Sequence, residues 1–391
     1  MWSHQFALTP QLTGQYNRLL ILNYVKNHGV ISRADLVREL GLSFPTVSSN
    51  VQSLLDGKFL LEIGEGSNTL GRKSTLLSFN KDRGYVLSID VGRFTIRSAV
   101  ADLSGNIIRQ KNLDTHLNDN VSLTDKIIKL FDELIYESGK TYDSVLCIAV
   151  GTPGVEEPSG ALSIAPFMPD ISIKDLRLKL KDKYANAHII VDNSVKMGAL
   201  GEAAKGSGVD FNNFVLINYG VGIGAALILD RKLYKGSHNI AGVIGFMLPS
   251  YKDRMDSFDP SGSFEKQLTI FKHEKKLSNA EFIDKVQALL KDYRSNNEKA
   301  VKIFRTIIEA FSVSVVNIAA VLDVDAIIIS GGFGISVVKE FADELRSMLQ
   351  NQVPHPPKII FSALHNNEGV IGGISVAIDW IHSSPDNLFM L

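Results

Sequence analysis

Short apolar stripes at helical spacing dominate residues 1–80 and predict helices there. The apolar residues of QYNRLLILNYVKNHG fall on roughly one helical face, and Gly29 is suited to end that helix. Ser32 is a typical N-cap for a second helix, which Gly41 would end, and Pro45 fits the first turn of a third helix because no amide donor is needed there. Two helices joined by the short turn GLS are typical of a helix-turn-helix.

The third predicted helix has an apolar face and a polar face. Val47, Val51, Leu54 and Leu55 recur at helical spacing and are expected to face inward. The alternative to a functional surface is that the remaining polar side chains only solvate the helix. We predict instead that the polar residues on or near the open side approach base edges and phosphates in a DNA major groove; these are Thr46, Ser48, Ser49, Asn50 and Gln52.

The segment that follows favours DNA binding. FLLEIGEGSNTLGRKSTLLSFN predicts two strands around a polar loop, the hairpin of a winged helix, and its tip carries Arg72 and Lys73, a basic pair that can enter a minor groove. Residues 1–80 hold seven Lys or Arg against five Asp or Glu, an excess of only two. We therefore expect specific binding to double-stranded DNA to require a homodimer or higher homo-oligomer.

From Tyr85 onward, strand patterns alternate with helix patterns. YVLSIDVG, TIRSAVADLSG and NIIRQKNLD predict a meander, LTDKIIKLFDELI a helix, and SVLCIAVG and HIIVDN buried strands. The same order of strand patterns begins again with FVLINYG, GIGAALILDRK and IAGVIGFML, which we expect to form a second strand hairpin. EGVIGGISVAIDWI predicts a helix at the end of the body. Two lobes that open alike predict a duplicated α/β architecture with a cleft between the halves.

Composition excludes several classes of protein. The 391 residues are 45% hydrophobic, and 41 basic against 42 acidic side chains give no overall basic charge, so a nucleic-acid surface must be local. The single cysteine, Cys147, excludes an internal disulfide and a cysteine-cluster metal site. No apolar run reaches the ~18 residues of a membrane span, and MWSHQFALTPQ lacks the order of a secretion signal, so we expect a cytoplasmic protein with no membrane partner.

The body resembles the ROK family, which groups sugar kinases with transcriptional repressors. LSIDVGRFTIRSAVADLSGNII, GTPGV, NYGVGIGAALILDRKLYKG with AGVIGF, and IIISGGFG stand in the family's order and spacing. With the predicted winged helix, the resemblance covers nearly the whole chain and is to the branch of the xylose and N-acetylglucosamine repressors. It implies a winged helix-turn-helix at 1–80 and a two-lobed, actin-like sugar-kinase body, with lobe 1 at 81–200, lobe 2 at 201–366 and a C-terminal helix at about 367–391 that rejoins lobe 1.

Two departures from the family's kinases bear on catalysis. The resemblance implies an Asp-x-Gly-Gly-Thr turn at the nucleotide phosphates, where glycine lets the backbone approach; here Arg93 and Phe94 follow Gly92 and fill that space. The catalytic aspartate of the kinases aligns with Ser194, and loss of a general base typically lowers rates by ~10²–10⁴. Asp192 is a poor substitute, because strand alternation points it another way. We therefore expect no enzyme activity and no cofactor.

The family's sugar and zinc positions are altered as well. In the run that resembles Ala-Gly-Glu-x-Gly-His, Val243 and Phe246 replace the sugar-binding Glu and the His, and DSFDPSGSFE lacks the cysteines of the family's zinc loop, so we expect no metal. Asn193 and Glu265 remain as polar contacts, although each could instead serve as a turn or capping residue. By alignment, an effector would be bounded by Gly154, Phe167, Asn193, Ser194, Val243, Phe246 and Glu265, with Phe167 at the position of a sugar-binding asparagine.

Three functions remain open. The first is a DNA-binding transcriptional regulator, expected to be a repressor of carbohydrate-related genes, whose inactive kinase-like body serves dimerisation and sensing; it accounts for all the departures together. The second is an active sugar kinase with an appended DNA-binding domain. The third is a regulator or scaffold with no small-molecule effector. The cleft then holds either a sugar or sugar derivative with a stackable face, or nothing in a collapsed pocket.

Overall fold

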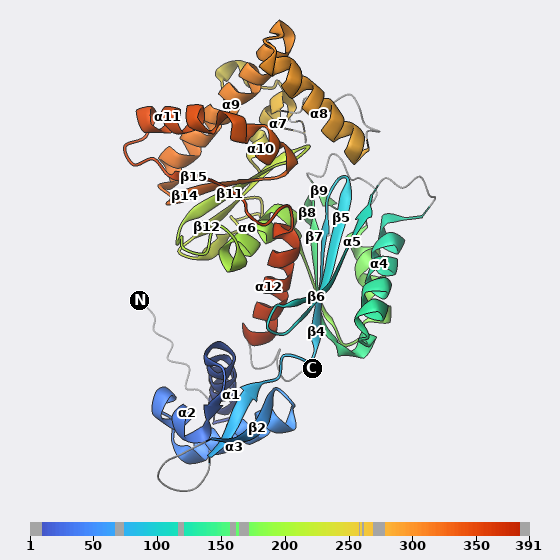
Figure 1. The fold of residues 1–391 in the computed structure, drawn as a ribbon, viewed down its shortest axis with the longest axis vertical. Coiled ribbons are helices and arrows are strands. Elements are labelled where there is room, and N and C mark those ends of the chain that lie inside the picture. The colour runs from blue at the N-terminus through green and yellow to red at the C-terminus, as the bar shows by residue number, and fades with distance from the viewer. Residues whose placement is uncertain are drawn as a thin grey trace.

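The computed structural model describes residues 10–66, 74–115, 121–156, 162–163, 172–257, 259, 262–268 and 278–383. A small unit of helices and strands lies at one end of the long axis, and two α/β lobes lie above it (Figure 1). The predicted fold class is confirmed, because each lobe has its own five-stranded sheet and the small unit is a winged helix-turn-helix.

The N-terminal unit contains α1 (Pro10–His28), α2 (Arg33–Leu40) and α3 (Phe44–Asp56), and a sheet of order β1-β3-β2 from β1 (Ile31–Ser32), β3 (Ser74–Phe79) and β2 (Leu60–Gly66). The predicted helix ends are confirmed. The Ser32 side chain accepts a hydrogen bond from the amide of Asp35, and Gly41 ends α2 at φ 65°, a left-handed conformation that favours glycine. Pro45 lies in the first turn of α3.

Lobe 1 is built on a sheet of order β10-β7-β4-β5-β6. Its strands are β4 (Tyr85–Val91), β5 (Thr95–Asp102), β6 (Ile107–Asp114), β7 (Val145–Thr152) and β10 (His188–Asn193). Helices α4 (Leu123–Ser138) and α5 (Ile173–Lys183) cover one face, where apolar side chains of alternate strand positions form a common core. The short elements are η1 (Tyr142–Ser144), β8 (Val155–Glu156) and β9 (Leu162–Ser163).

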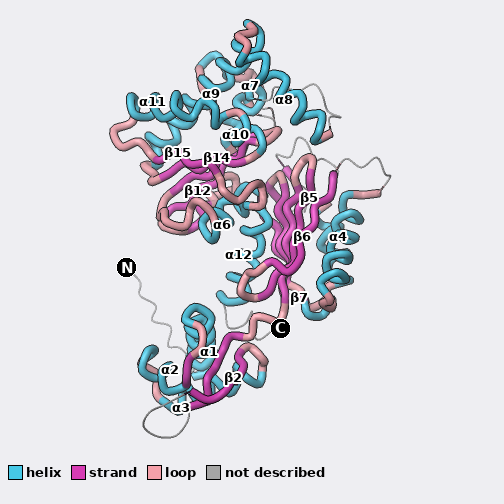
Figure 2. The backbone as a smooth tube through the Cα atoms, in the orientation of Figure 1, coloured by secondary structure: helices cyan, strands magenta, loops and turns pink. Residues whose placement is uncertain are grey.

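Lobe 2 repeats the plan with a sheet of order β13-β12-β11-β14-β15. Its strands are β11 (Phe214–Tyr219), β12 (Ile223–Leu229), β13 (Lys232–Tyr234), β14 (Ala326–Ser330) and β15 (Lys358–Phe361). Its outer face is covered by helices (Figure 2), which are α7 (Ser263–Leu268), α8 (Asn279–Arg294), α9 (Glu298–Leu322), α10 (Gly332–Ser336) and α11 (Ala342–Gln352). The 3-10 turns are η2 (Ile244–Phe246), η3 (Tyr251–Asp253) and η4 (Val338–Phe341).

Helix α9 is long and apolar because it forms the spine of lobe 2. Among the described residues it is the single helix whose length and composition would suit a membrane span, and half of that apolar window is buried inside the protein. Phe304, Phe311 and Val315 of α9 lie in the core that also holds the outer face of the sheet. Packing against a sheet therefore accounts for its apolar composition.

One predicted strand is wrong. IAGVIGFML was expected to continue the hairpin of lobe 2, but the third strand is β13, and residues 244–246 form the turn η2. Gly242 adopts φ 88°, which extended backbone does not allow, and its carbonyl accepts a hydrogen bond of 2.7 Å from the amide of Ala225. A left-handed glycine close to β12 thus ends the extended chain before this segment.

Two helices cross between the lobes: α6 (Ser194–Lys205) and α12 (Glu368–Ser383). The inner face of the lobe 2 sheet packs against α6, and the inner face of the lobe 1 sheet packs against α12. The two helices touch backbone to backbone, because a Cβ on Gly372 would overlap the carbonyl oxygen of Met197, and one on Gly201 would overlap that of Glu368. Glycine at these positions is what permits so close an approach.

The winged helix is joined to the body by a shared core. Leu22 and Val25 of α1 belong to the same cluster of buried side chains as Ile378 and Ile381 of α12. His382, only 7% exposed at the end of α12, lies 2.9 Å through Nδ1 from Nζ of Lys26 on α1. The N-terminal unit therefore meets the body at the end of the C-terminal helix.

Burial determines the protonation state of His382. Desolvation, with the nearby charge of Lys26 as a smaller cause, lowers the pKa of His382 to about 3. The charged groups that face it are Lys26 and, through Lys26, Asp379 on α12. Desolvation also lowers the pKa of Lys26, and Asp379 opposes that shift. The neutral ring therefore accepts a hydrogen bond from the lysine through Nδ1.

Acid should destabilise this junction. The pKa of His382 in the folded protein lies below its ordinary value of 6.5. Between pH 6.5 and pH 3, the histidine is therefore protonated in the unfolded chain but not in the folded one, so the free energy of unfolding decreases as the pH falls through this range. Between about pH 7.5 and about pH 5, the unfolding free energy of the native protein should fall by at least ~1.4 kcal/mol more than that of His382→Gln. Urea unfolding at the two pH values measures the difference. Equal losses in both proteins would contradict a buried neutral histidine.

Candidate functional site

A cavity of about 530 Å³ opens between the two lobes. Five of the predicted effector residues line it: Gly154, Asn193, Ser194, Val243 and Glu265. Phe246, on η2, is not among the lining residues, and Phe167 lies outside the described residues. The cleft is open in this structure, which does not support the alternative of a collapsed pocket.

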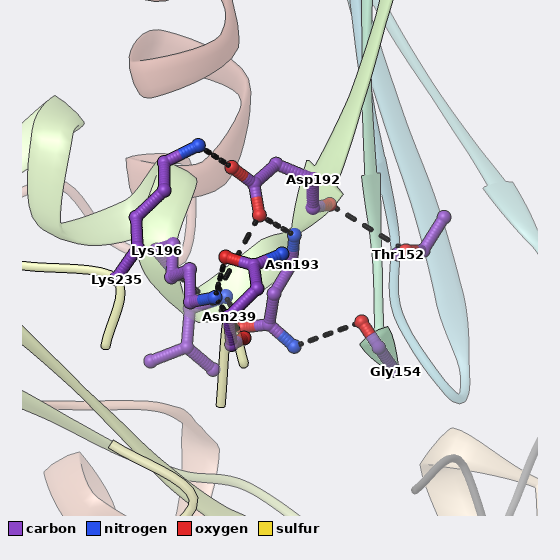
Figure 3. A network of polar contacts seen from close by, with 8 residues as sticks. Thr152, Gly154, Asp192, Asn193, Lys196, Lys235 and Asn239 are labelled. Atoms are coloured by element: carbon purple, nitrogen blue, oxygen red, sulfur yellow. Dashed lines mark hydrogen bonds and ion pairs between the residues drawn. The ribbon is translucent and has the colours of Figure 1, made fainter. Parts of the chain in front are cut away.

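Asn193 ends β10 and caps α6. Its side-chain oxygen accepts hydrogen bonds from the amides of Val195 (2.9 Å) and Lys196 (3.4 Å), and its Nδ2 donates to the carbonyl of Gly154 at 3.2 Å (Figure 3). These bonds satisfy the first turn of α6 and tie it to the loop after β7. The side chain thus lines the cavity while it serves as a capping residue.

Ser194 lies where the resemblance implies the catalytic base. Its Oγ and Oδ1 of Asp90 both lie against Gly151, at 3.2 and 3.3 Å from the position of a Cβ there. Burial raises the pKa of Asp90, and the Ser194 hydroxyl and the charge of Arg97 offset part of the rise. A serine hydroxyl beside a buried carboxyl group does not accept a proton from a substrate hydroxyl near neutral pH, so Ser194 does not replace the catalytic aspartate.

Asp192 is engaged in ion pairs. Its Oδ2 lies 2.8 Å from Nζ of Lys235, its Oδ1 accepts from the amide of Asn193 at 2.8 Å, and Nζ of Lys196 is 3.9 Å away (Figure 3). Buried Lys196 in turn donates to Oδ1 and the carbonyl of Asn239, at 2.6 and 2.5 Å. Asp192 is not among the residues that line the cavity, so the network serves to hold the end of β10 against the loop before η2.

Glu265 is the acidic residue that the sequence predicted in the cleft. It lies on α7, and its Oε1 accepts from the amide of Ile223 at 3.4 Å. Burial raises the pKa of Glu265 to about 7, and the bond from Ile223 opposes the rise. Near neutral pH this carboxyl group is divided between a form that donates to a hydroxyl and a form that only accepts.

The turn between β4 and β5, where the resemblance implies a phosphate site, is closed by a backbone hydrogen bond but carries two bulky side chains. Gly92 donates its amide to the carbonyl of Thr95 at 3.1 Å, which closes the turn between β4 and β5. Arg93 and Phe94 both line the cavity, and the Arg93 guanidinium lies 5.4 Å from the centre of the Phe94 ring. Desolvation lowers the pKa of Arg93, in agreement with its partial burial. Bulky side chains thus stand where the resemblance to the kinases implies exposed backbone.

Glu368 and part of α8 line the cavity although they were not predicted from the sequence. Glu368, the first residue of α12, lies at the cleft, and burial raises its pKa to about 7. Asn279, Phe282 and Val286 line it from α8. The apolar pair at i and i+4 within α8 is the signal that could have found them.

The polar face of α3 differs from the prediction at one residue. Ser49 and Gln52 are exposed, and Thr46 and Ser48 are half-buried. Asn50 is only 5% exposed, and its Nδ2 donates to the carbonyl of Thr46 at 2.7 Å. Its predicted contact with DNA is therefore wrong, because positions three and four residues apart share a helix face and Asn50 lies beside Val47, Val51 and Leu54. Arg72 and Lys73 lie outside the described residues.

Metal ligands are not assembled in the described part of the chain. No group of three His, Cys, Asp or Glu side chains there has a geometry that could hold an ion. Cys147 is fully buried in β7, and burial raises the pKa of its thiol to about 12. It therefore behaves as a small apolar residue and not as a ligand.

Comparison with known proteins agrees with this architecture. The ROK family profile matches residues 86–379. The xylose repressor of Bacillus subtilis (strain 168) is 27% identical over 375 residues, which are 93% of this chain and 95% of that protein. A ROK family transcriptional regulator, a homologue of the E. coli MLC protein, superposes with a TM-score of 0.71 at 19% identity over 97% of this chain and 98% of its own. A ROK hexokinase from Thermus thermophilus superposes with a TM-score of 0.59 at 16% identity, over 74% of this chain and 96% of its own.

Removing the charge of Glu265 should stabilise the protein in a pH-dependent way. A carboxyl group whose pKa is raised from 4.5 to about 7 makes a contribution to stability that is fully present below pH 4.5 and is lost as the pH rises from 4.5 through 7. Glu265→Gln should therefore raise the thermal midpoint by roughly 2–4 °C at about pH 8 and hardly change it at about pH 4. Differential scanning calorimetry measures both, with exposed Glu309→Gln as the control. An equal shift at the two pH values would contradict the raised pKa.

Proposed function

Because the chain belongs to the ROK family, we propose that it is a DNA-binding transcriptional repressor of carbohydrate-related genes, with a kinase-like body that senses a ligand and does not phosphorylate it. The observation that carries the proposal is the winged helix packed on a two-lobed body whose base position is Ser194. The xylose repressor of Bacillus subtilis, which aligns along nearly the whole chain, supports the same role.

The absence of catalysis rests on the geometry of the cleft. Sugar phosphorylation needs a base within hydrogen-bond reach of the attacking hydroxyl. Ser194 is a hydroxyl, and the nearest carboxylate in sequence, Asp192, pairs with Lys235 and does not line the cavity. Phosphoryl transfer also relies on bare backbone around the phosphates, and Arg93 and Phe94 occupy that turn.

The cleft is suited to a sugar or a sugar derivative. Its volume of about 530 Å³ is that of a small-molecule site, and it combines the carboxyl groups of Glu265 and Glu368 with the rings of Phe94 and Phe282. Carboxyl groups near their pKa satisfy hydroxyl groups as donors or acceptors, and an aromatic ring accepts the apolar face of a pyranose. Val243 replaces one polar contact, so affinity for an unmodified hexose should be low.

In the proposed complex, the exposed face of α3 from each of two protomers contacts the DNA. Ser49 and Gln52 stand on its open face, and the side chain of Gln52 is held by a hydrogen bond of 2.8 Å from its Nε2 to Oδ1 of Asp56. A single winged helix with so small an excess of positive charge binds weakly, so we propose a homodimer that reads two half-sites. Such a protein acts in the cytoplasm, where it meets the chromosome.

Substitutions in α3 and in the predicted wing should affect DNA binding in two different ways. Gln52→Ala should change the sequence preference and weaken the best site by ~1–3 kcal/mol, because a side chain in the major groove reads base edges. Arg72→Ala with Lys73→Ala should weaken all sequences alike and flatten the salt dependence. Selection from a pool of random duplexes, followed by gel-shift titration at several salt concentrations, distinguishes the two effects. Exposed Gln352→Ala on lobe 2 is the control for Gln52, and unchanged preference in Gln52→Ala would remove α3 from the interface.

The body should not phosphorylate sugars. In a coupled assay of ADP release, the purified protein with ATP, magnesium and each common hexose or pentose should remain at background, since the position of the kinases' catalytic aspartate holds Ser194. The same preparation must bind its selected DNA, which shows that it is folded. Sugar-dependent turnover that disappears in Asp192→Asn would establish the kinase function instead.

A further inference from the structure

We infer that α12 couples the cleft to the DNA-binding unit, and that Lys26 and His382 are the positioning residues at its far end. The inference rests on the proposed function and concerns how the state of the cleft reaches the winged helix. Three sets of contacts along this single helix support it.

The first turn of α12 is bonded to both lobes at the cleft. Oε1 of Glu368 accepts from Nδ2 of Asn218 on β11 at 3.4 Å, and Asn218 also donates to Ser330 on β14 at 3.0 Å. From lobe 1, Oγ of Ser88 on β4 donates to the carbonyl of Val370 at 2.9 Å. Any movement of one lobe relative to the other must therefore shift this turn or break one of these bonds.

At three glycines in its first half, α12 has no side chain of its own between its backbone and its neighbours. Gly372 lies against the carbonyl of Met197 on α6, and Gly373 lies against Oγ of Ser88. Gly369 lies against the carboxyl group of Asp90. Contacts this close leave little room to absorb a displacement, so we expect α12 to move with α6 and β4.

The far end of α12 meets the winged helix through a part-buried polar pair at the edge of an apolar cluster. Leu22 and Val25 of α1 belong to the same cluster as Ile378 and Ile381, and His382 bonds with Lys26. A hydrogen bond between desolvated groups is satisfied in one arrangement only, whereas apolar contacts alone allow sliding. The pair therefore sets the position of α1, and with it the recognition helix α3.

These contacts span the length of the helix. Sixteen residues at ~1.5 Å each extend over roughly 24 Å, from the cleft to the DNA-binding unit. Ligand binding that favours one arrangement of the lobes would favour one position of α12 and so one arrangement of α3 in the dimer. Coupling of this kind acts in both directions, since each site must bias the other by the same free energy.

The experiment perturbs the cleft end of α12 and measures hydrogen exchange at the other end in the full chain. Ser88→Ala removes the bond to Val370, and Gly372→Ala forces α12 away from α6. Both should speed exchange of the α1 amides at least ~3-fold. Ser314→Ala is the matched control, because its buried hydroxyl also bonds to a backbone carbonyl, that of Ala310 within α9; it should leave α1 unchanged.

The reciprocal arm perturbs the DNA-binding end. His382→Gln and Lys26→Met should speed exchange in the first turns of α12, next to the cleft, whereas exposed His355→Gln should not. Unchanged exchange in α1 in both cleft-end variants would overturn the coupling. If Gly372→Ala fails to fold, Ser88→Ala alone decides.

A second measurement separates this inference from the proposed function. The affinity of each variant for a duplex that the native protein selects from a random pool should change in His382→Gln and not in His355→Gln. If the native protein selects no duplex, the proposed DNA binding fails, while the exchange data still decide whether α12 couples the two ends.

Discussion

The backbone contact between α6 and α12 is the constraint on which the rest of the structure depends. Gly201 and Gly372 allow the two helices to meet without intervening side chains, and each helix carries the inner face of one sheet. Because α6 begins at Asn193 and Ser194 and α12 begins at Glu368, the same contact brings these three residues to one cleft. A larger residue at either glycine would separate the sheets and open the cavity at its base.

The electrostatics of the cleft follow from that close packing. Carboxyl groups at Asp90, Glu265 and Glu368 are all withdrawn from water, and burial raises the pKa of each of them. The lining therefore carries less negative charge at neutral pH than its composition suggests, and it offers hydroxyl-binding groups. A phosphoryl-transfer site requires the opposite, a firm negative charge for metal ions and a free base.

Local features could be predicted from the sequence, and contacts between distant segments could not. Ser32, Gly41 and Pro45 determined the helix ends through backbone chemistry that acts within a few residues. The error at Asn50 came from overlooking that a polar residue beside Val47 and Val51 can be buried when its amide bonds to a backbone carbonyl of its own helix. No pattern in the sequence links Lys26 to His382, which are separated by 356 positions and meet only because α12 returns to α1.

The shared core of α1 and α12 also bears on how such a protein can diversify. A winged helix joined by a loose tether could be exchanged for another that reads different DNA, with the body unchanged. Here the first and the last described helices of the chain contribute side chains to one apolar cluster, and half-buried Lys26 meets buried His382 at its edge. Recombination that replaced only the N-terminal unit would leave a mismatched surface on α12, so the two ends of the chain must be inherited or engineered together.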